Sequence, residues 1–185
     1  MDASLVLDFL NQLKTNNNRE WFQENKKWYE AAKKEVETFV TAMITSISAI
    51  DPALQTPAMK DCMFRIFRDV RFGADKSPYK TNFGAFIARG GRKSNFPGYY
   101  FHFEPGQCML AAGVYQPQPD TLKLLRDEVY FHAPELKDIL AKPAFKKHVD
   151  SLGDFDKMKK APKDYPADFP DIDLLKYRSY IVSAN

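Results

Sequence analysis

Eight basic residues gather in the thirty residues from Phe64 to Lys93, and their types suit the binding of an anion. Only two acidic residues lie among them, so this stretch has a net charge of +6, whereas the whole chain has +3. Basic residues concentrated beside apolar, strand-like sequence are typical of an anion site or of a dense ion-pair network. The candidates for ligand binding are Arg65, Arg68, Asp69, Arg71, Lys76, Tyr79 and Lys80.

The three arginines of this set allow two interpretations. In the first, they form a planar clamp with many donors for a phosphate or carboxylate. Asp69 would then orient one guanidinium, and Lys76 and Lys80 would close over the same anion. In the second, Asp69 bridges the arginines in a ladder of surface ion pairs. Exposed ion pairs contribute little to stability, so stability alone is a weak reason for three arginines in seven residues. We therefore favour the clamp.

Three further residues are candidates for catalysis. Tyr79 lies among the basic residues and could act as an acid or base, although a ring packed on the sheet is the more common role for such a tyrosine. His102 and Glu104 are two residues apart on one strand face, so they could share a proton or a metal ion. Two groups are too few for a structural zinc site, and the other histidines have no ligand pattern around them. We predict no metal, and the absence of nucleotide-binding motifs predicts no cofactor.

The first fifty residues predict a helical hairpin. Ser4 is a suitable N-cap for a first helix, and the three asparagines at 16–18 end it. Asn18 then caps a longer second helix, whose apolar residues recur with a period of 3.6 until Pro52 prevents its continuation.

From Cys62 the period of apolar residues changes to 2, which predicts strands. A strand over 64–72 would place Arg68 on its mainly apolar face. We therefore expect either a β-bulge that redirects this side chain or a buried ion pair. The next strand is expected over 82–89.

A β-hairpin follows, with strands over 99–104 and 108–115. The sequence Glu-Pro-Gly-Gln at 104–107 suits a type II turn, since Pro is favoured at its second position and Gly at its third. Alternation along the first strand places Tyr100, His102 and Glu104 on one face.

After the hairpin, Asp120 is expected to cap a helix, and two shorter helical patterns open at Pro134 and Pro143. Residues 154–171 are rich in Pro, Lys and Asp, which predicts a surface loop. Residues 174–183 are strand-like and are expected to rejoin the sheet.

These elements predict an α+β fold over one domain, residues 1–185: a mainly antiparallel, twisted sheet with an N-terminal helical hairpin and further helices packed on it. Two cysteines are too few for a disulfide framework. The first residues do not form a signal peptide, and no apolar run is long enough to cross a membrane. We expect a soluble cytoplasmic protein that does not associate with membranes.

The sequence resembles the uncharacterised family DUF2461. Its signature RxxRDxRFxxxKxxY is similar to Arg65-x-x-Arg68-Asp69-x-Arg71-Phe72-x-x-x-Lys76-x-x-Tyr79. Segments 16–26, 97–106 and 111–126 are similar to the family as well, so the resemblance covers most of the chain. It implies no activity. It does imply a further helical segment after the last strand, which a chain ending at Asn185 would lack.

The sequence is therefore compatible with three functions. The leading one is the binding of a small anionic ligand at the arginine-rich strand and the loop after it, either for binding alone or for catalysis. A second is nucleic-acid binding, in which basic residues follow the backbone and aromatic rings stack on bases. The residues for this second function are Arg89, Arg92, Lys93, Phe96, Tyr99 and Tyr100. The third is a non-catalytic interaction domain whose charge ladder is structural.

Overall fold

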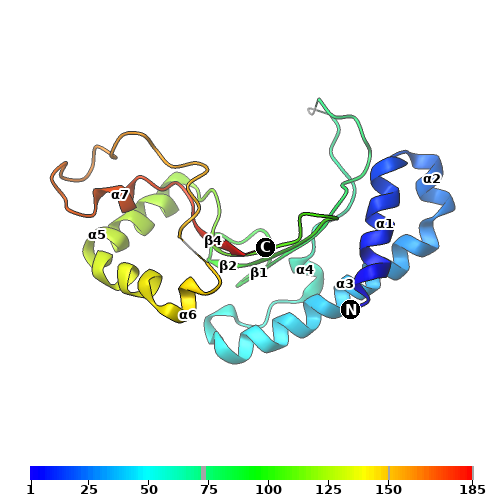
Figure 1. The fold of residues 1–185 in the computed structure, drawn as a ribbon, viewed down its shortest axis with the longest axis horizontal. Coiled ribbons are helices and arrows are strands. Elements are labelled where there is room, and N and C mark those ends of the chain that lie inside the picture. The colour runs from blue at the N-terminus through cyan, green and yellow to red at the C-terminus, as the bar shows by residue number, and fades with distance from the viewer. Residues whose placement is uncertain (72–73, 150, 185) are drawn as a thin grey trace. The chain divides into compact units, whose positions relative to one another are not determined.

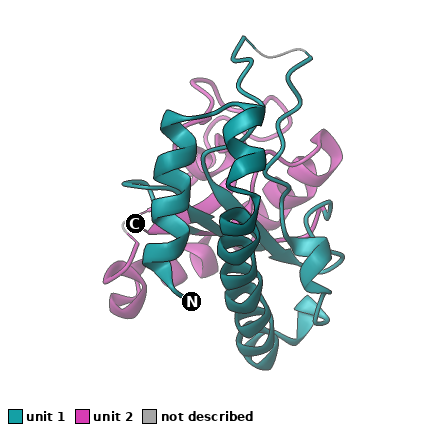
Figure 2. Cartoon of the chain, turned by 90° about the vertical axis from the view of Figure 1, so that its right-hand side faces the viewer, with its two compact units in different colours: residues 1–94, 98–110, 185 teal, residues 95–97, 111–184 magenta. Residues whose placement is uncertain are grey.

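The computed structural model describes residues 1–71, 74–149 and 151–184 and has an α+β fold (Figure 1). Four strands form an antiparallel sheet, which confirms the predicted α+β fold, and their order is β1-β2-β3-β4. They are β1 (Phe83–Ala88), β2 (Gly98–Phe103), β3 (Met109–Val114) and β4 (Tyr180–Ala184). The chain divides into two compact units, residues 1–94 with 98–110 and residues 95–97 with 111–184 (Figure 2).

The first unit begins with the predicted helical hairpin, whose second helix is in two pieces, followed by two short helical segments that were not predicted. They are α1 (Ala3–Thr15), α2 (Arg19–Glu24), α3 (Lys26–Ile50), the short 3-10 helix η1 (Pro52–Leu54) and α4 (Met59–Cys62). The predicted second helix is divided at Asn25, whose side-chain amide donates to the carbonyl of Trp21 at 2.9 Å. This bond competes with the helical pattern, so α2 ends there and α3 begins anew.

Of the two N-caps predicted for the first helices, one is confirmed and one is wrong. Asn18 caps α2 as predicted, because its side chain accepts a hydrogen bond from the Trp21 amide at 2.9 Å. The cap of α1 is Asp2 and not Ser4, since the Asp2 carboxylate accepts from the Leu5 amide at 3.0 Å. Both residue types are good caps, and the helix starts earlier than the sequence suggested.

An aromatic core holds the first unit together around Phe9, which is fully buried. Its ring contacts those of Trp21, Phe22, Trp28, Tyr29 and Phe83. These rings come from α1, α2, α3 and β1, so one side chain joins the helical hairpin to the sheet. Aromatic pairs of this kind add stability beyond the area that they bury.

Residues 63–82, of which 72 and 73 lie outside the described residues, form an irregular extension that we name the basic arm. The predicted strand over 64–72 is wrong as far as it is described: the arm has two isolated antiparallel bridges, Met63 with Ala85 and Phe67 with Tyr79. Pro78 has no N–H to donate, so the two sides cannot form a continuous ladder. The arm projects away from β1 and β2 on the side of α1 and α2 (Figure 1).

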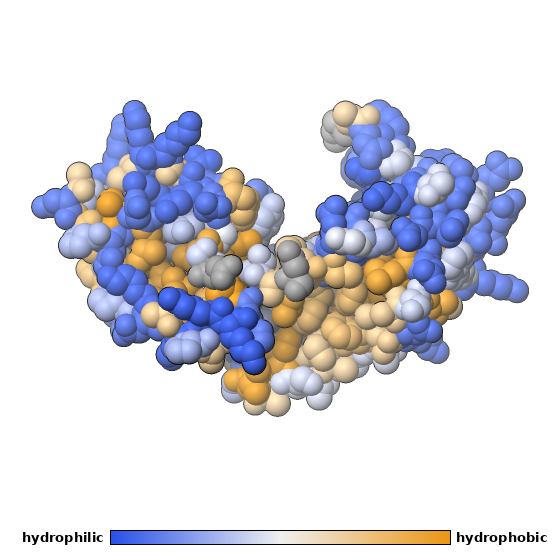
Figure 3. All heavy atoms as spheres, in the orientation of Figure 1, coloured by the Kyte–Doolittle hydropathy of each residue, from blue (hydrophilic) through white to orange (hydrophobic). Residues whose placement is uncertain are grey.

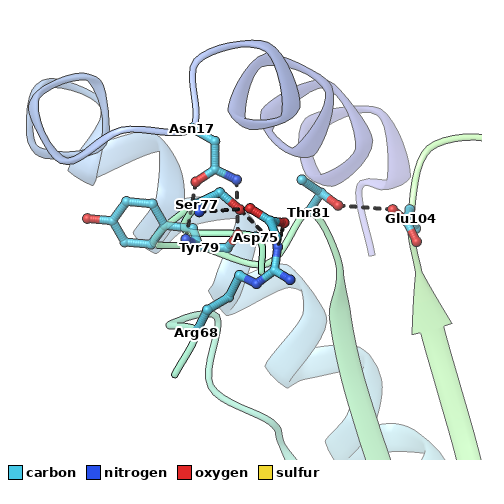
Figure 4. A network of polar contacts seen from close by, with 7 residues as sticks. All are labelled: Asn17, Arg68, Asp75, Ser77, Tyr79, Thr81 and Glu104. Carbon is cyan, nitrogen blue, oxygen red and sulfur yellow. Dashed lines mark hydrogen bonds and ion pairs between the residues drawn. The ribbon is translucent and has the colours of Figure 1, made fainter. Parts of the chain in front are cut away.

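The base of the arm is fixed by Tyr79. Its ring stacks on Phe22 with centroids 3.9 Å apart, and both side chains are 3% exposed. Its backbone N–H donates to the Asn17 side chain at 3.1 Å, and its carbonyl accepts from the same side chain at 2.9 Å (Figure 4). The loop between α1 and α2 therefore holds the returning side of the arm.

The predicted turn at the end of β2 is present. The Gln107 amide donates to the Glu104 carbonyl at 3.0 Å, and Gly106 has a φ of +77°. A positive φ at the third position is the mark of a type II turn, which glycine adopts at low cost.

The second unit contains the helices after the hairpin. They are α5 (Pro119–Ala141), α6 (Pro143–Lys146) and α7 (Ile172–Leu175), followed by β4. The N-cap of α5 is Gln118 rather than Asp120, with Pro119 in the first turn. The helix expected to open at Pro134 is not separate but continues α5 beyond a kink at His132. The kink arises because Pro134, inside the helix, has no N–H for a helical hydrogen bond. Residues 174–179 precede β4, so the last strand is shorter than predicted.

We predict that Phe22→Ala will lower the free energy of unfolding by about 3–5 kcal/mol, because it leaves a cavity against both Tyr79 and Phe9. Tyr79→Phe should change the free energy of unfolding little, since it keeps the stacked ring. Urea denaturation measures both variants. Equal stability of Phe22→Ala and the parent protein would contradict the stacked arrangement.

Candidate functional site

Arg68 lies in the basic arm and is held by the turn that follows it. Its guanidinium forms an ion pair with Asp75, and its Nη1 donates to the Ser77 hydroxyl at 2.9 Å (Figure 4). The Ser77 amide donates to Asp75 at 2.8 Å, and this bond is the main reason that the pKa of Asp75 is below its ordinary value. The Arg68 side chain is 36% exposed, so the expected buried ion pair is wrong: the pair exists, but at the surface.

Arg71 and Asp69 form a second ion pair in the arm. Arg71 Nε and Nη2 donate to the two carboxylate oxygens of Asp69 at 2.9 and 2.7 Å, a pair that both the clamp and the ladder predict. These bonds lower the pKa of Asp69. Lys76 Nζ donates to the Val70 carbonyl at 2.9 Å. Three of the candidate residues thus make contacts within the arm itself.

Arg65 and Lys80 differ from these residues. Among the described residues, neither forms an ion pair with a carboxylate. Lys80 is half-buried, with Nζ 5.5 Å from the centroid of the Phe64 ring. Partial burial lowers the pKa of Lys80, and repulsion from Arg65 and Arg68 lowers it further. The Lys80 amide donates to the Ile66 carbonyl at 2.7 Å and the Arg68 amide to the Pro78 carbonyl at 2.9 Å, so the segment with Arg65 and Arg68 lies directly opposite Lys80.

We name Arg65, Arg68 and Lys80 the cation cluster. The surface of the arm that contains it is mainly hydrophilic (Figure 3). Its three positive charges repel one another, and Asp75 neutralises only Arg68 directly. The cluster is therefore a place where an added anion would relieve repulsion.

Tyr79, although next to Lys80 in the sequence, points its ring the other way. The ring lies in the core between Phe22 and Phe67, with centroid distances of 3.9 and 5.5 Å. The structure therefore separates this candidate for proton transfer from the cation cluster.

Of the other two catalytic candidates, His102 lies on β2 and Glu104 directly follows this strand, and a third residue joins them. His102 Nε2 is 3.0 Å from Glu104 Oε2, and His102 Nδ1 is 2.8 Å from the hydroxyl of Tyr100. Thr81 donates to the other oxygen of Glu104 at 3.0 Å (Figure 4). We name Tyr100, His102 and Glu104 the Tyr-His-Glu row. Tyr100 was not among the residues predicted for catalysis, although strand alternation placed it on the same face as His102 and Glu104.

The hydrogen bonds of the row define the tautomer of His102. Glu104 has a lowered pKa, chiefly because of its bond with His102, and as a carboxylate it can only accept. His102 Nε2 must therefore bear the proton and donate to it. In the neutral imidazole Nδ1 is then an acceptor, which agrees with the Tyr100 hydroxyl and, more distantly, the Asn82 amide at 3.4 Å, both of which can donate to it.

Phe64 links the row to the cation cluster. Its ring lies 6.3 Å from that of Tyr100, in an edge-on arrangement, and Lys80 lies over it. Gly84 of β1 leaves room here, because a Cβ at that position would be 3.0 Å from the Tyr100 hydroxyl and 3.4 Å from Phe64. The two groups of side chains therefore meet at one ring of the first unit.

Other features of the described residues do not add to this site. They contain no group of three His, Cys, Asp or Glu side chains that could hold a metal ion. No helix among them is long and apolar enough to cross a bilayer. A depression of about 420 Å³ on α3 is lined by Lys34, Glu37, Thr38, Thr41 and Ala42 and includes none of the candidates.

Comparison with known proteins gives a family and no activity. A family model described as a conserved hypothetical protein (DUF2461) matches residues 5–185. No curated protein and no solved structure matches the chain.

We predict that Glu104 stabilises the fold in a pH-dependent way. Because its folded pKa is below its ordinary value of 4.5, its contribution is present above that pH and is lost as the pH falls through the folded pKa. The melting temperature of Glu104→Gln should therefore be below that of the parent protein at neutral pH, and the difference should shrink in acid.

Glu20→Gln, on an exposed part of α2, is the control for the loss of one carboxylate. A difference between Glu104→Gln and the parent that stays constant from neutral to strongly acidic pH would contradict the assigned bond to His102.

Proposed function

The chain belongs to the DUF2461 family of conserved hypothetical proteins, and we propose that it binds a small anionic ligand, with a phosphate or carboxylate group, at the cation cluster. The observation behind this proposal is the charge of the cluster. Arg65 and Lys80 form no ion pair with a carboxylate among the described residues, and the pKa of Lys80 is lowered first by partial burial and then by repulsion from Arg65 and Arg68.

A fold gains nothing by holding like charges together. The repulsion costs free energy, and a bound anion would recover it while gaining charge-assisted hydrogen bonds. A guanidinium presents several donors in a plane that matches phosphate and carboxylate oxygens, and a lysine adds a point charge. Arg65, Arg68 and Lys80 together offer both kinds of contact.

The remaining residues of the original set support the arm in this proposal. Asp75 and Ser77 hold the Arg68 guanidinium, so less side-chain freedom is lost when an anion binds. Asp69, Arg71 and Lys76 make contacts within the arm and would fix its conformation.

The alternatives have less support. Nucleic-acid binding would need aromatic rings on a shared face, but Tyr99 packs against the core and bonds Asp51, whereas Tyr100 lies on the opposite face of β2. Arg92 already donates to the Lys60 carbonyl. A purely structural ladder would explain the pairs Arg68–Asp75 and Arg71–Asp69 and the attraction between Arg65 and Asp69, but not the position of Lys80 beside like charges.

We predict that phosphate will raise the melting temperature more than chloride does at matched ionic strength. An anion held by the folded cluster stabilises it by mass action, by about 2.7 kcal/mol at a concentration of 100 times the dissociation constant. Arg65→Gln and Lys80→Gln should lose this increment. Lys93→Gln, at an exposed residue outside the cluster, should retain it.

The same variants give a second readout without phosphate. Lys80→Gln should then melt at the same temperature as the parent protein or higher, because it removes repulsion. A clear loss of stability would favour a structural role for Lys80. The proposal fails if neither phosphate nor a panel of carboxylates gives a specific shift.

A further inference from the structure

The Tyr-His-Glu row has the arrangement of an activated nucleophile. In such arrangements a base lies within hydrogen-bonding distance of a hydroxyl, and a third group orients the base. Here His102 Nδ1 is 2.8 Å from the Tyr100 hydroxyl, and Glu104 holds the opposite nitrogen at 3.0 Å. Both His102 and Glu104 are largely buried, with side chains 18% and 20% exposed.

The direction of the hydrogen bonds is the one that activation requires. When His102 is neutral and donates from Nε2 to Glu104, its free lone pair lies on Nδ1 and faces the phenol. Thr81 bonds the second oxygen of Glu104, so this carboxylate is held at both oxygens. A structural hydrogen bond between a tyrosine and a strand neighbour would not need a histidine fixed in one tautomer.

We infer that Tyr100 is a nucleophile, activated by His102 and Glu104, and that it receives an acyl or phosphoryl group from an anionic donor. In this step the Tyr100 oxygen forms a bond to the electrophilic carbon or phosphorus. The bond to the leaving group breaks and its electron pair departs with that group, while the phenol proton moves to His102 Nδ1. Glu104 stabilises the imidazolium that results.

This inference rests on the proposed anion site, which supplies the donor's orientation. The Phe64 ring contacts the Tyr100 ring edge-on, and the Lys80 amine lies over the Phe64 ring. The nucleophile and the cation cluster are therefore both next to Phe64. A leaving group that departs as an anion would gain from those cations. The absence of a side chain at Gly84 keeps the Tyr100 hydroxyl and Phe64 close to the strand.

Para-fluorosulfonylbenzoate tests the inference, because it combines a carboxylate with an electrophile whose adducts on tyrosine are stable. The Tyr100 oxygen would bond to sulfur, fluoride would leave, and peptide mass spectrometry would locate the label. We expect labelling at Tyr100, slowed by phosphate. His102→Gln should reduce the rate by about 100-fold, the lower end of what a general base contributes, and Glu104→Gln should also reduce it.

Tyr99→Phe and Tyr100→Phe are matched controls, because each removes one phenol hydroxyl from adjacent residues on opposite faces of β2. Only Tyr100→Phe should abolish the label. Labelling of Lys80 in place of Tyr100, or labelling of Tyr100 that His102→Gln leaves unchanged, would overturn the inference.

The phosphate shift in melting temperature, measured on the same samples, separates the two proposals. A shift without Tyr100 labelling overturns the nucleophile and retains the anion site. Labelling that depends on His102 but occurs with no phosphate shift supports the nucleophile and overturns the anion site.

Discussion

The stacking of Tyr79 on Phe22 is the contact on which the arrangement of the site depends. It fixes one residue of the basic arm against the aromatic core at 3.9 Å between ring centroids. Because neighbouring side chains in extended backbone point to opposite sides, Lys80 must then lie on the other side, over Phe64. The position of the cation cluster is therefore a consequence of core packing, and the row on β2 lies beside it because Phe64 contacts both.

The arm also shows how stability and charge are balanced. Two arginines are paired with aspartates within a few residues of the chain, which costs little and holds the arm in one conformation. Lys80 is left beside like charges, on a half-buried aromatic ring. Such an arrangement does not favour folding, and natural proteins retain destabilising groups chiefly where function requires them.

The sequence predicted those elements whose signals are local. Alternation in Tyr-Tyr-Phe-His-Phe-Glu assigned the face of β2, and Asn18 marked the start of α2 through its own side chain. The arm was predicted incorrectly, because alternating apolar residues suggested a strand while Pro78, on the opposite side, prevented the ladder that a strand needs. The partner of Arg68 could not be inferred, since Asp75 lies seven residues further along the chain and only the folded arm brings the two together. Tyr79 lies in the core and not beside the cation cluster because its ring stacks on Phe22. Phe22 is more than fifty residues away in the sequence, and periodicity cannot reveal such a contact.

The two bonds between Asn17 and Tyr79 have a consequence for the edge of the arm. The carbonyl of Pro78 and the amide of Lys80 face the opposite side of the arm, bonding Arg68 and Ile66 at 2.9 and 2.7 Å. The N–H and C=O of Tyr79 therefore face outward, as on the edge strand of a sheet, where a strand from another molecule could pair with them. The Asn17 side-chain amide has one N–H donor and one C=O acceptor available, like a peptide group. It bonds both the C=O and the N–H of Tyr79. One side chain thus makes the two hydrogen bonds that a neighbouring strand would make, so neither backbone group of Tyr79 is left for another strand.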